Sequence, residues 1–526
     1  MAFDIIVIGS GFGGAITACR LAQSGRSVLV LERGRRWDKT NFPRKPEDPW
    51  IWDHDHPESE NGWLDLRVFP AMSVAAGAGV GGGSLIYANI SCEAPRSVFD
   101  TGWPAEITYA QLKEHYDAVA EMMDVRPVPD NQWTARMRLM KDAADAAGFG
   151  DRFRKLDLAV NFDPHWTYAD FARGEAASTE APNKHGALQG TCVHLGYCDI
   201  GCSVYAKNTL DRNYLYVAEN KHAAEVRCLH LVDRIEPLPD GTYRVSFDVL
   251  QDGQRIAGCE TARIVIVAAG SLGSTELLLR CRDVHGTLPN LSPFLGRNWS
   301  GNGDFLTPAF YDQRSVDPDQ GPTIAAAIDF EDRSQGGQAF WIEDGGLPNL
   351  LAGYLQRKAQ DPTAGMKAKL LIDALRIYIR TPDSLRNVMP WFAQGVDAGN
   401  GTLQLTERTL FCDGGKLHLN WNSGATRAVI DAIIAMHQRL SSGTGGTVLV
   451  PPTWSLFRDL ATPHPLGGCN MGDTAADGVV DFAGRVFGYP NLYVADAAII
   501  PRPLGVNPSR TIGALAEHIA AVINAG

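Results

Sequence analysis

The chain begins with two apolar runs that flank a glycine-rich turn and a helical stretch. Residues 4–8 (D-I-I-V-I) and 27–31 (S-V-L-V-L) have the length and continuity of strands buried on both faces. Between them, G-S-G-F-G-G at 9–14 precedes A-I-T-A-C-R-L-A-Q at 15–23, which predicts a helix that ends near Gly25. Glu32 follows the second run. This order is typical of dinucleotide binding.

The glycine-rich turn and the acidic residue after the second strand each have a physical role in dinucleotide binding. Glycines let the backbone approach a pyrophosphate, which the free N–H groups of a helix N-terminus favour. Glu32 is placed to accept hydrogen bonds from a ribose hydroxyl and disfavours a 2′-phosphate, so FAD or NAD is expected rather than NADP. A glycine-rich turn of another α/β fold is the alternative, but it would leave Glu32 unexplained.

Three later segments continue this pattern. Residues 263–269 (R-I-V-I-V-A-A) predict another buried strand, followed by G-S-L-G-S at 270–274. Near the end, 491–494 leads into Asp496, and G-V-N-P-S at 505–509 precedes a helix with apolar residues at 512, 515, 516 and 519. In G-A-G-V-G-G-G-S-L at 77–85, six of nine residues are glycine or serine, which predicts a close approach of the backbone to a ligand or to another loop.

The intervening segments have different periodicities. Helical spacing starts at residue 108 (T-Y-A-Q-L-K-E-H-Y) and recurs from 425 to 440. Alternation at 402–406 (T-L-Q-L-T) and 416–421 (K-L-H-L-N-W) predicts strands. A β-sheet with helices behind it is the expected arrangement.

Composition narrows the functional classes. A chain of 526 residues with 45% hydrophobic and 21% charged residues is expected to fold as a globular protein of several domains. The net charge of −12 argues against nucleic acid or an anionic membrane as the main partner. We expect no membrane span and a cytoplasmic location, since the chain lacks a long apolar run and a leader-like start, and its ten cysteines are scattered.

Taken in order, these blocks resemble the glucose–methanol–choline (GMC) oxidoreductases, and most closely their cholesterol-oxidase-like branch. The resemblance rests on G-S-G-F-G-G with Glu32, G-V-G-G-G-S-L, A-A-G-S-L-G-S, H-P-L-G-G-C at 464–469, N-L-Y-V-A-D at 491–496 and G-V-N-P at 505–508. It implies an α/β fold, with a Rossmann-like FAD-binding domain and a discontinuous α+β substrate-binding domain that carries an antiparallel sheet. The expected FAD domain comprises 1–40, 70–105, 190–305 and 460–526, and the substrate domain 41–69, 106–189 and 306–459.

The resemblance also implies which residues hold the cofactor. No histidine follows the G-G-G-S loop, so the FAD is expected to be non-covalent. The expected FAD-binding residues are Gly9, Gly11, Phe12, Gly13, Gly14, Glu32, Arg33, Gly77, Gly81, Gly82, Gly83, Ser84, Val226, Ala269, Gly270, Asp496, Ala497, Asn507, Pro508 and Thr511.

Alcohol oxidation by hydride transfer needs a base for the hydroxyl proton and a group that orients the oxygen. His464 lies between two prolines that restrict its backbone, and Asn507 lies at the start of the last helix. The resemblance implies that both grip the substrate hydroxyl. The alternatives are a structural histidine turn and a helix-capping asparagine.

The chain departs from the sterol-oxidising pattern at two places. Ile86-Tyr87-Ala88-Asn89 replaces the usual Asn-Gly-Gly, and no glutamate lies near 385–389 to isomerise a steroid. We therefore expect a bulky, apolar or aromatic alcohol, with oxygen or another acceptor taking the electrons. The expected cavity aromatics, which could equally be core residues, are Trp341, Tyr354, Tyr378, Trp391 and Phe392. A non-redox, FAD-containing lyase remains an alternative.

Three cysteines, Cys192, Cys198 and Cys202, follow a C-x5-C-x3-C spacing. This spacing resembles that of FAD-dependent glucose dehydrogenases, in which three cysteines hold a [3Fe–4S] cluster, and it implies a sugar or polyol dehydrogenase that passes electrons to a cytochrome. The alternative is three reduced, packed thiols, because Leu195 replaces a fourth cysteine of cholesterol-oxidase-like relatives.

Overall fold

The computed structural model describes residues 3–45, 47–348, 382–407 and 414–526. Its larger sheet has seven strands in the order β10-β2-β1-β13-β12-β11, with β22 also paired to β13. The parallel part consists of β1 (Phe3–Ile8), β2 (Val28–Leu31), β10 (Glu225–Arg227), β13 (Gln254–Val267) and β22 (Leu492–Val494). The antiparallel extension consists of β11 (His230–Pro237) and β12 (Tyr243–Gln251).

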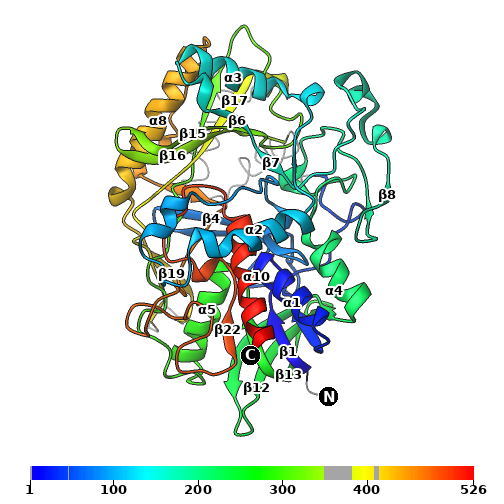
Figure 1. Cartoon of the computed structure of the whole chain (residues 1–526), viewed down its shortest axis with the longest axis vertical. Coiled ribbons are helices and arrows are strands. Elements are labelled where there is room, and N and C mark those ends of the chain that lie inside the picture. Colours follow the sequence, from blue (N-terminus) through cyan, green and yellow to red (C-terminus); the bar gives the residue numbers. More distant parts are fainter. Residues whose placement is uncertain (1–2, 46, 349–381, 408–413) are drawn as a thin grey trace.

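Helices cover this sheet and bring its two chain ends together. Helix α1 (Phe12–Gln23) packs against α10 (Ser509–Ala525) and α4 (Tyr214–His222), and α10 also packs against α2 (Tyr109–Met122). Helix α5 (Gly270–Asp283) begins directly after β13. In Figure 1 these elements form the lower half of the molecule, with both termini near its base.

A second, antiparallel sheet forms the upper half (Figure 1). Its strand order is β20-β14-β17-β16-β15-β6. Its strands are β6 (Phe153–Lys155), β14 (Phe305–Phe310), β15 (Ala326–Gln335), β16 (Gln338–Asp344), β17 (Val388–Gly395) and β20 (Thr447–Val448). Helices α3 (Ala135–Ala146) and α8 (Arg427–Ser442) pack on it, and Trp391 of β17 bonds to Ser441 of α8.

Smaller elements connect the halves. A three-stranded sheet has the order β21-β4-β3. The remaining elements are β3 (Leu64–Phe69), β4 (Met72–Gly77), β5 (Arg126–Pro127), β7 (Asp157–Leu158), β8 (Ala181–Pro182), β9 (Leu188–Gln189), β18 (Thr402–Leu405), β19 (Leu417–Asn420), α9 (Pro452–Phe457) and β21 (Leu460–Thr462). Within the described ranges, no helix combines the length and apolarity that a membrane crossing requires.

The expected fold class is confirmed, whereas the boundaries of the two domains stay a prediction. Two element boundaries in the structure differ from those that the sequence predicted. The strand expected at 263–269 begins at Gln254, because its first half is an exposed hairpin arm rather than a buried run. The helix expected from residue 15 begins at Phe12, so Gly13 and Gly14 belong to its first turn and Gly11 is its N-cap.

Candidate active site

The two glycine-rich loops meet face to face. A Cβ atom added to Gly82 would lie 2.6 Å from the Cα of Gly11, and one added to Gly77 would lie 2.2 Å from the carbonyl oxygen of Gly82. Gly81 and Gly82 also have positive φ angles, of 104° and 50°. Only glycine permits this contact between the loop at 9–14 and the short helix η1 (Gly82–Leu85).

Two further segments approach the first loop at the carboxyl ends of the parallel strands. A Cβ atom on Gly9 would lie 2.4 Å from the oxygen of Ala268, and one on Gly13 would lie 1.9 Å from the oxygen of Ala495. Asp496 accepts hydrogen bonds from Gly270 N (2.7 Å) and Ala498 N (2.8 Å). The expected cofactor segments around 9–14, 77–84, 269–270 and 496–497 therefore come together at one edge of the sheet.

Glu32 is buried at the end of β2 and is already engaged. Its Oε2 accepts from the Ser10 hydroxyl (2.6 Å) and backbone N (3.1 Å), and its Oε1 accepts from Gly34 N (2.9 Å). Gly81 N in turn donates to the Ser10 hydroxyl (3.1 Å). Ser10 thus ties the first loop, the acid and the second loop together, and a carboxylate still has lone pairs for a ribose hydroxyl.

The side chains of other expected cofactor residues bind protein groups. Arg33 pairs with Asp65 at 2.7 Å and lies over the Trp52 ring. Ser84 donates to Gly81 O (2.7 Å), and Thr511 bonds to the Tyr116 hydroxyl (2.9 Å). Any contact of these residues with a cofactor would therefore run largely through their backbones. Half-buried Val226 lies on β10, next to β2, and Pro508 caps α10.

Open space beside the joined loops fits a bound dinucleotide. Gly83 is exposed, and a Cβ atom on it would meet no atom within 4 Å; the same holds for Gly270. Helix α1 has Gly11 at its cap and receives no side-chain hydrogen bond there, so its first N–H groups remain available to a phosphate. These residues fit the pyrophosphate and flavin of FAD.

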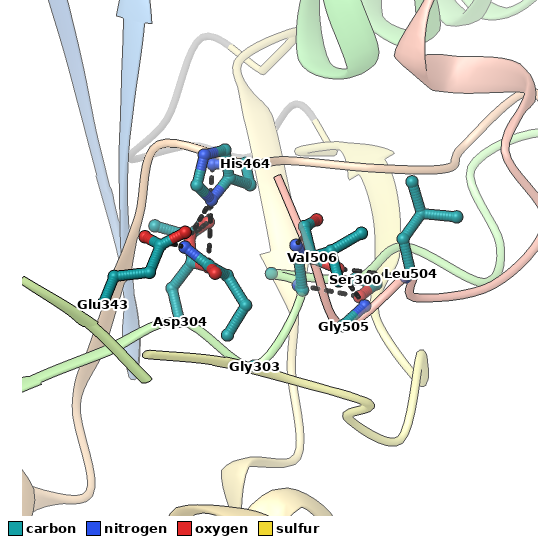
Figure 2. A network of polar contacts seen from close by, with 12 residues as sticks. Ser300, Gly303, Asp304, Glu343, His464, Leu504, Gly505 and Val506 are labelled. Carbon is teal, nitrogen blue, oxygen red and sulfur yellow. Dashed lines mark hydrogen bonds and ion pairs between the residues drawn. The ribbon is translucent and has the colours of Figure 1, made fainter. Parts of the chain in front are cut away.

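His464 is paired with a buried carboxylate that the sequence did not indicate. Its Nδ1 lies 3.0 Å from Asp304 Oδ1 and 2.9 Å from Oδ2, and Asp304 is 2% exposed. Thr462 Oγ1 accepts from His464 N (2.8 Å) and donates to Asp304 Oδ2 (2.6 Å). The pKa of Asp304 is raised overall, because the effect of burial exceeds the opposing effect of the His464 pairing. A proton on Nδ1 that faces Asp304 leaves Nε2 as a proton acceptor (Figure 2).

One loop, residues 300–304 (S-G-N-G-D), connects His464 to the segment that carries Asn507. Asn302 Oδ1 accepts from Leu504 N (3.0 Å) and Gly505 N (2.9 Å), and its Nδ2 donates to Val506 O (2.9 Å). Asp304, two residues later, holds His464. Figure 2 shows both branches of this network.

Asp397 stabilises that loop. It accepts hydrogen bonds from the Ser300 hydroxyl (2.8 Å), from Gly301 N and Gly303 N (both 3.1 Å) and from Gly399 N (2.8 Å). Burial raises its pKa to about 6. Asp397, to which the sequence assigned no role, therefore supports both catalytic candidates at once.

A second missed carboxyl group lies beside them. Glu343, on β16, is fully buried, and its Oε2 accepts from Gln394 Nε2 on the adjacent strand (3.0 Å). Burial raises the pKa of Glu343 well above the usual range, and the nearby Asp344 and Asp304 raise it as well. Its position on a strand of the distant sheet gave no sequence signal, whereas the glycine-rich S-G-N-G-D before a strand could have drawn attention to Asp304.

The expected cavity aromatics divide between the two faces of β16 and β17. The Phe392 ring lies 6.2 Å from that of His464, and Trp341 donates to Gln394, so both belong to the face that holds Glu343. Trp391 points to the opposite face, toward α8. Tyr354 and Tyr378 lie outside the described residues.

The structure does not support the alternative of an iron–sulfur site at Cys192, Cys198 and Cys202. Among the described residues, which include all of 190–202, no group of three or more His, Cys, Asp or Glu side chains is arranged to hold a metal ion. Burial raises the pKa values of Cys192 and Cys198, which disfavours the thiolates that a cluster requires. His194 is stacked on Trp166 at 4.3 Å and bonded to Gln132. These cysteines are free thiols in a packed segment.

Comparison with known proteins supports this architecture. The GMC oxidoreductase family model matches residues 416–516, and an NAD(P)-binding Rossmann-like domain model matches 7–37. The chain is 30% identical to a cholesterol oxidase of Acinetobacter baumannii (99% of this chain, 94% of that protein) and 32% identical to one of Mycobacterium tuberculosis H37Rv (99% and 91%).

More distant proteins share the fold. A long-chain-alcohol oxidase of Arabidopsis thaliana, FAO4B, is 23% identical over 99% of this chain and 67% of its own. The crystal structure of pyridoxine 4-oxidase from Mesorbium loti superposes with a TM-score of 0.65 at 16% identity, over 100% of this chain and 99% of that one. GMC oxidoreductases carry FAD and oxidise alcohols. With glycine loops that fit this cofactor and relatives that match along its whole length, the chain belongs to the GMC oxidoreductase family, in its cholesterol-oxidase-like branch.

Proposed function

We propose that this FAD-dependent alcohol oxidoreductase acts on a bulky, apolar alcohol, with His464 as the base and Asn507 as the group that orients the hydroxyl. The observation that carries the proposal is the pairing of His464 Nδ1 with buried Asp304, at 2.9–3.0 Å, in the same network as the Asn507 segment. A histidine oriented by a carboxylate is the arrangement that a positioned general base requires.

In this proposal the cofactor and each of the three side chains have a separate role in the reaction. FAD, when bound, supplies the acceptor for the hydride of the carbinol carbon. His464 Nε2 takes the hydroxyl proton, and the Asp304 carboxylate stabilises the imidazolium that forms. Asn507 contacts the same oxygen and holds the C–H bond in line for transfer. Positioned general-base catalysis of this kind contributes roughly 10²–10⁴-fold to the rate.

Two features favour an apolar substrate. Phe392 lies beside His464, and Leu306, which pairs with Phe392 across β14 and β17, is 38% exposed. Among similar proteins, the two cholesterol oxidases and the long-chain-alcohol oxidase are named for apolar alcohols.

Anaerobic bleaching of the flavin absorbance tests the proposal. Steroids, aryl alcohols, long-chain alcohols and sugars are each mixed with the purified holoenzyme, and air is then admitted to separate oxidase from dehydrogenase behaviour. We expect bulky apolar alcohols to bleach the band fastest and His464→Ala to abolish bleaching without loss of bound FAD. Bleaching by sugars alone would overturn the substrate class, and no bleaching by any alcohol would favour a lyase.

A further inference from the structure

The chain that follows η1 is bonded to the start of α10 at four consecutive residues, which we call the 90–93 segment. The contacts are those of the Ser509 hydroxyl with Ile90 O (2.9 Å), Arg510 Nη1 with Ser91 O (3.3 Å), Cys92 Sγ with Asn507 O (3.4 Å) and Arg510 Nη2 with Glu93 Oε1 (3.1 Å). The 90–93 segment therefore links the glycine-rich loop at 77–85 to the proposed catalytic asparagine.

The carbonyl oxygen of Asn507 is buried and depends on Cys92. Asn507 precedes the cap of α10, so its carbonyl lies outside the hydrogen bonds of the helix, and Pro508 offers no N–H in the same peptide plane. Among the described residues, Cys92 Sγ is the one donor found for this oxygen. Burial raises the pKa of the Cys92 thiol well above its usual range, so the thiol keeps the proton that it donates.

Two side chains fix the peptide planes on either side of the Asn507 Cα. Asn302 Nδ2 donates to Val506 O (2.9 Å) in the plane before it, and Cys92 donates to Asn507 O in the plane after it. Because peptide groups are planar, these two planes set the backbone angles of residue 507 and the direction in which its side chain leaves the backbone. We propose that Cys92 is a positioning residue, whose thiol fixes the 507–508 peptide plane and thereby directs the Asn507 side chain toward the hydroxyl of the alcohol.

The 90–93 segment is itself held in place from behind. Ser91 N donates to Asp157 O (2.9 Å), and Ile90 forms a bridge with Leu158, so β7 supports the segment. Asn302 thus aligns the Asn507 turn with the loop that holds His464, and Cys92 aligns it with the loop expected to bind the flavin. Both alignments are needed to place the hydroxyl at the base and the C–H bond at the hydride acceptor. The inference rests on the proposed function of the site.

Infrared difference spectra test the contact without turnover. The S–H stretching band of wild type minus Cys92→Ala should lie at lower frequency than that of wild type minus Cys19→Ala, because a hydrogen bond weakens the S–H bond that donates it. The Cys19 thiol is fully buried, and no hydrogen bond of its side chain is found among the described residues. Equal frequencies overturn the proposal. Because no alcohol is added, this result is independent of whether any alcohol bleaches the flavin.

Stopped-flow flavin reduction at saturating alcohol tests the positioning role. Cys92→Ala removes the donor to Asn507 O, so the rate should fall by about tenfold with FAD content unchanged. Cys92→Ser keeps a donor at the same place, so its rate should stay within about threefold of wild type. A Cys92→Ala rate equal to wild type, or equal rates in Cys92→Ala and Cys92→Ser, overturns the proposal.

Cys281→Ala is the matched control. Cys281 is also buried, and its sulfur accepts a hydrogen bond from Ile235 N (3.3 Å) near the end of α5, away from the site. Its loss should lower the unfolding temperature and leave the rate of flavin reduction unchanged. A similar loss of rate in Cys281→Ala would attribute the effect of Cys92→Ala to a general loss of packing, which overturns the positioning role.

Discussion

At the scale of single residues, His464 depends on a carboxylate 160 positions earlier in the chain. In the proposed mechanism, the Asp304 carboxylate selects the tautomer with a proton on Nδ1, and its negative charge offsets the imidazolium that would form when Nε2 accepts a proton. The Thr462 hydroxyl bonds to both residues and limits rotation of the ring. Neither His464 nor Asp304 alone provides an oriented base.

Asp304→Asn should lower the rate of flavin reduction by roughly 10²–10⁴-fold, because the neutral amide can hold the wrong tautomer and cannot stabilise the imidazolium. Stopped-flow spectroscopy measures the rate, and flavin absorbance verifies that FAD is retained. Asp233→Asn, at a half-exposed ion pair with His285 and Arg280, serves as the matched control with an unchanged rate. A wild-type rate in Asp304→Asn would contradict the proposed action of Asp304 through His464.

The pH dependence of the wild-type enzyme should follow from the same pair. Burial raises the pKa of Asp304 above its usual range, so Asp304 gains a proton at a higher pH than an exposed aspartate. Once neutral, it no longer supports His464, and the rate should fall as the pH falls through the Asp304 pKa. Rate–pH profiles of wild type and Asp304→Asn measure this acid limb, whose midpoint should shift in the variant because residue 304 no longer titrates.

At the scale of elements, a single loop binds the two segments, from different parts of the fold, that carry the proposed catalytic residues. The loop at 300–304 precedes β14 of the upper sheet, His464 follows β21, and Asn507 precedes α10. Asn302 and Asp304 reach these segments, and Asp397, just after β17, fixes the loop through two backbone N–H groups and one hydroxyl. The flanking elements β14, β17, β21 and α10 hold the relative positions of His464 and Asn507.

Asn302→Ala should destabilise the protein and slow catalysis together. The change removes the partners of Leu504 N, Gly505 N and Val506 O, and each unsatisfied buried group costs about 1–3 kcal/mol. Thermal unfolding and flavin-reduction rates measure the two effects. Asn220→Ala, which loses one exposed bond within α4, is the matched control and should change neither. A normal rate in folded Asn302→Ala would show that the loop does not position Asn507.

At the scale of the whole molecule, the cofactor site consists of four segments that are far apart in the chain. The loops near 9–14, 77–84, 269–270 and 496–497 contact one another at the edge of the larger sheet, and the upper sheet places Glu343 and Phe392 beside His464. A ligand that binds across these segments in the native state stabilises that state, and the stabilisation increases as the Kd falls.

FAD should therefore raise the unfolding temperature of the apoprotein, with a stabilisation of about 2.7 kcal/mol at a hundredfold excess over Kd. Gly83→Ala should reduce this increment without changing the stability of the apoprotein, because the added Cβ meets no protein atom within 4 Å but enters the space expected for the flavin. Calorimetry with and without FAD measures both quantities. If FAD raised the unfolding temperature of Gly83→Ala as much as that of wild type, the flavin would lie away from η1.

The sequence by itself determined the FAD fold, because strand, glycine turn, helix and acid are contiguous and follow from local backbone and periodicity rules. It also indicated His464 and Asn507, through the ordered motifs around them. The sequence did not indicate what Asp304, Asn302, Asp397 and Glu343 contact, since their partners are distant in the chain and no local pattern encodes such contacts.

The cysteine spacing at 192–202 shows the opposite case, in which a local pattern left an iron–sulfur site open as an alternative and the fold does not support it. Ligand geometry depends on where side chains point and on whether burial permits thiolates, and spacing contains neither. Tertiary structure alone decided that these thiols are packed, that Asp304 faces His464 and that Glu343 bonds to Gln394. Burial and charge, which set the protonation of these groups, exist only after the two sheets have come together.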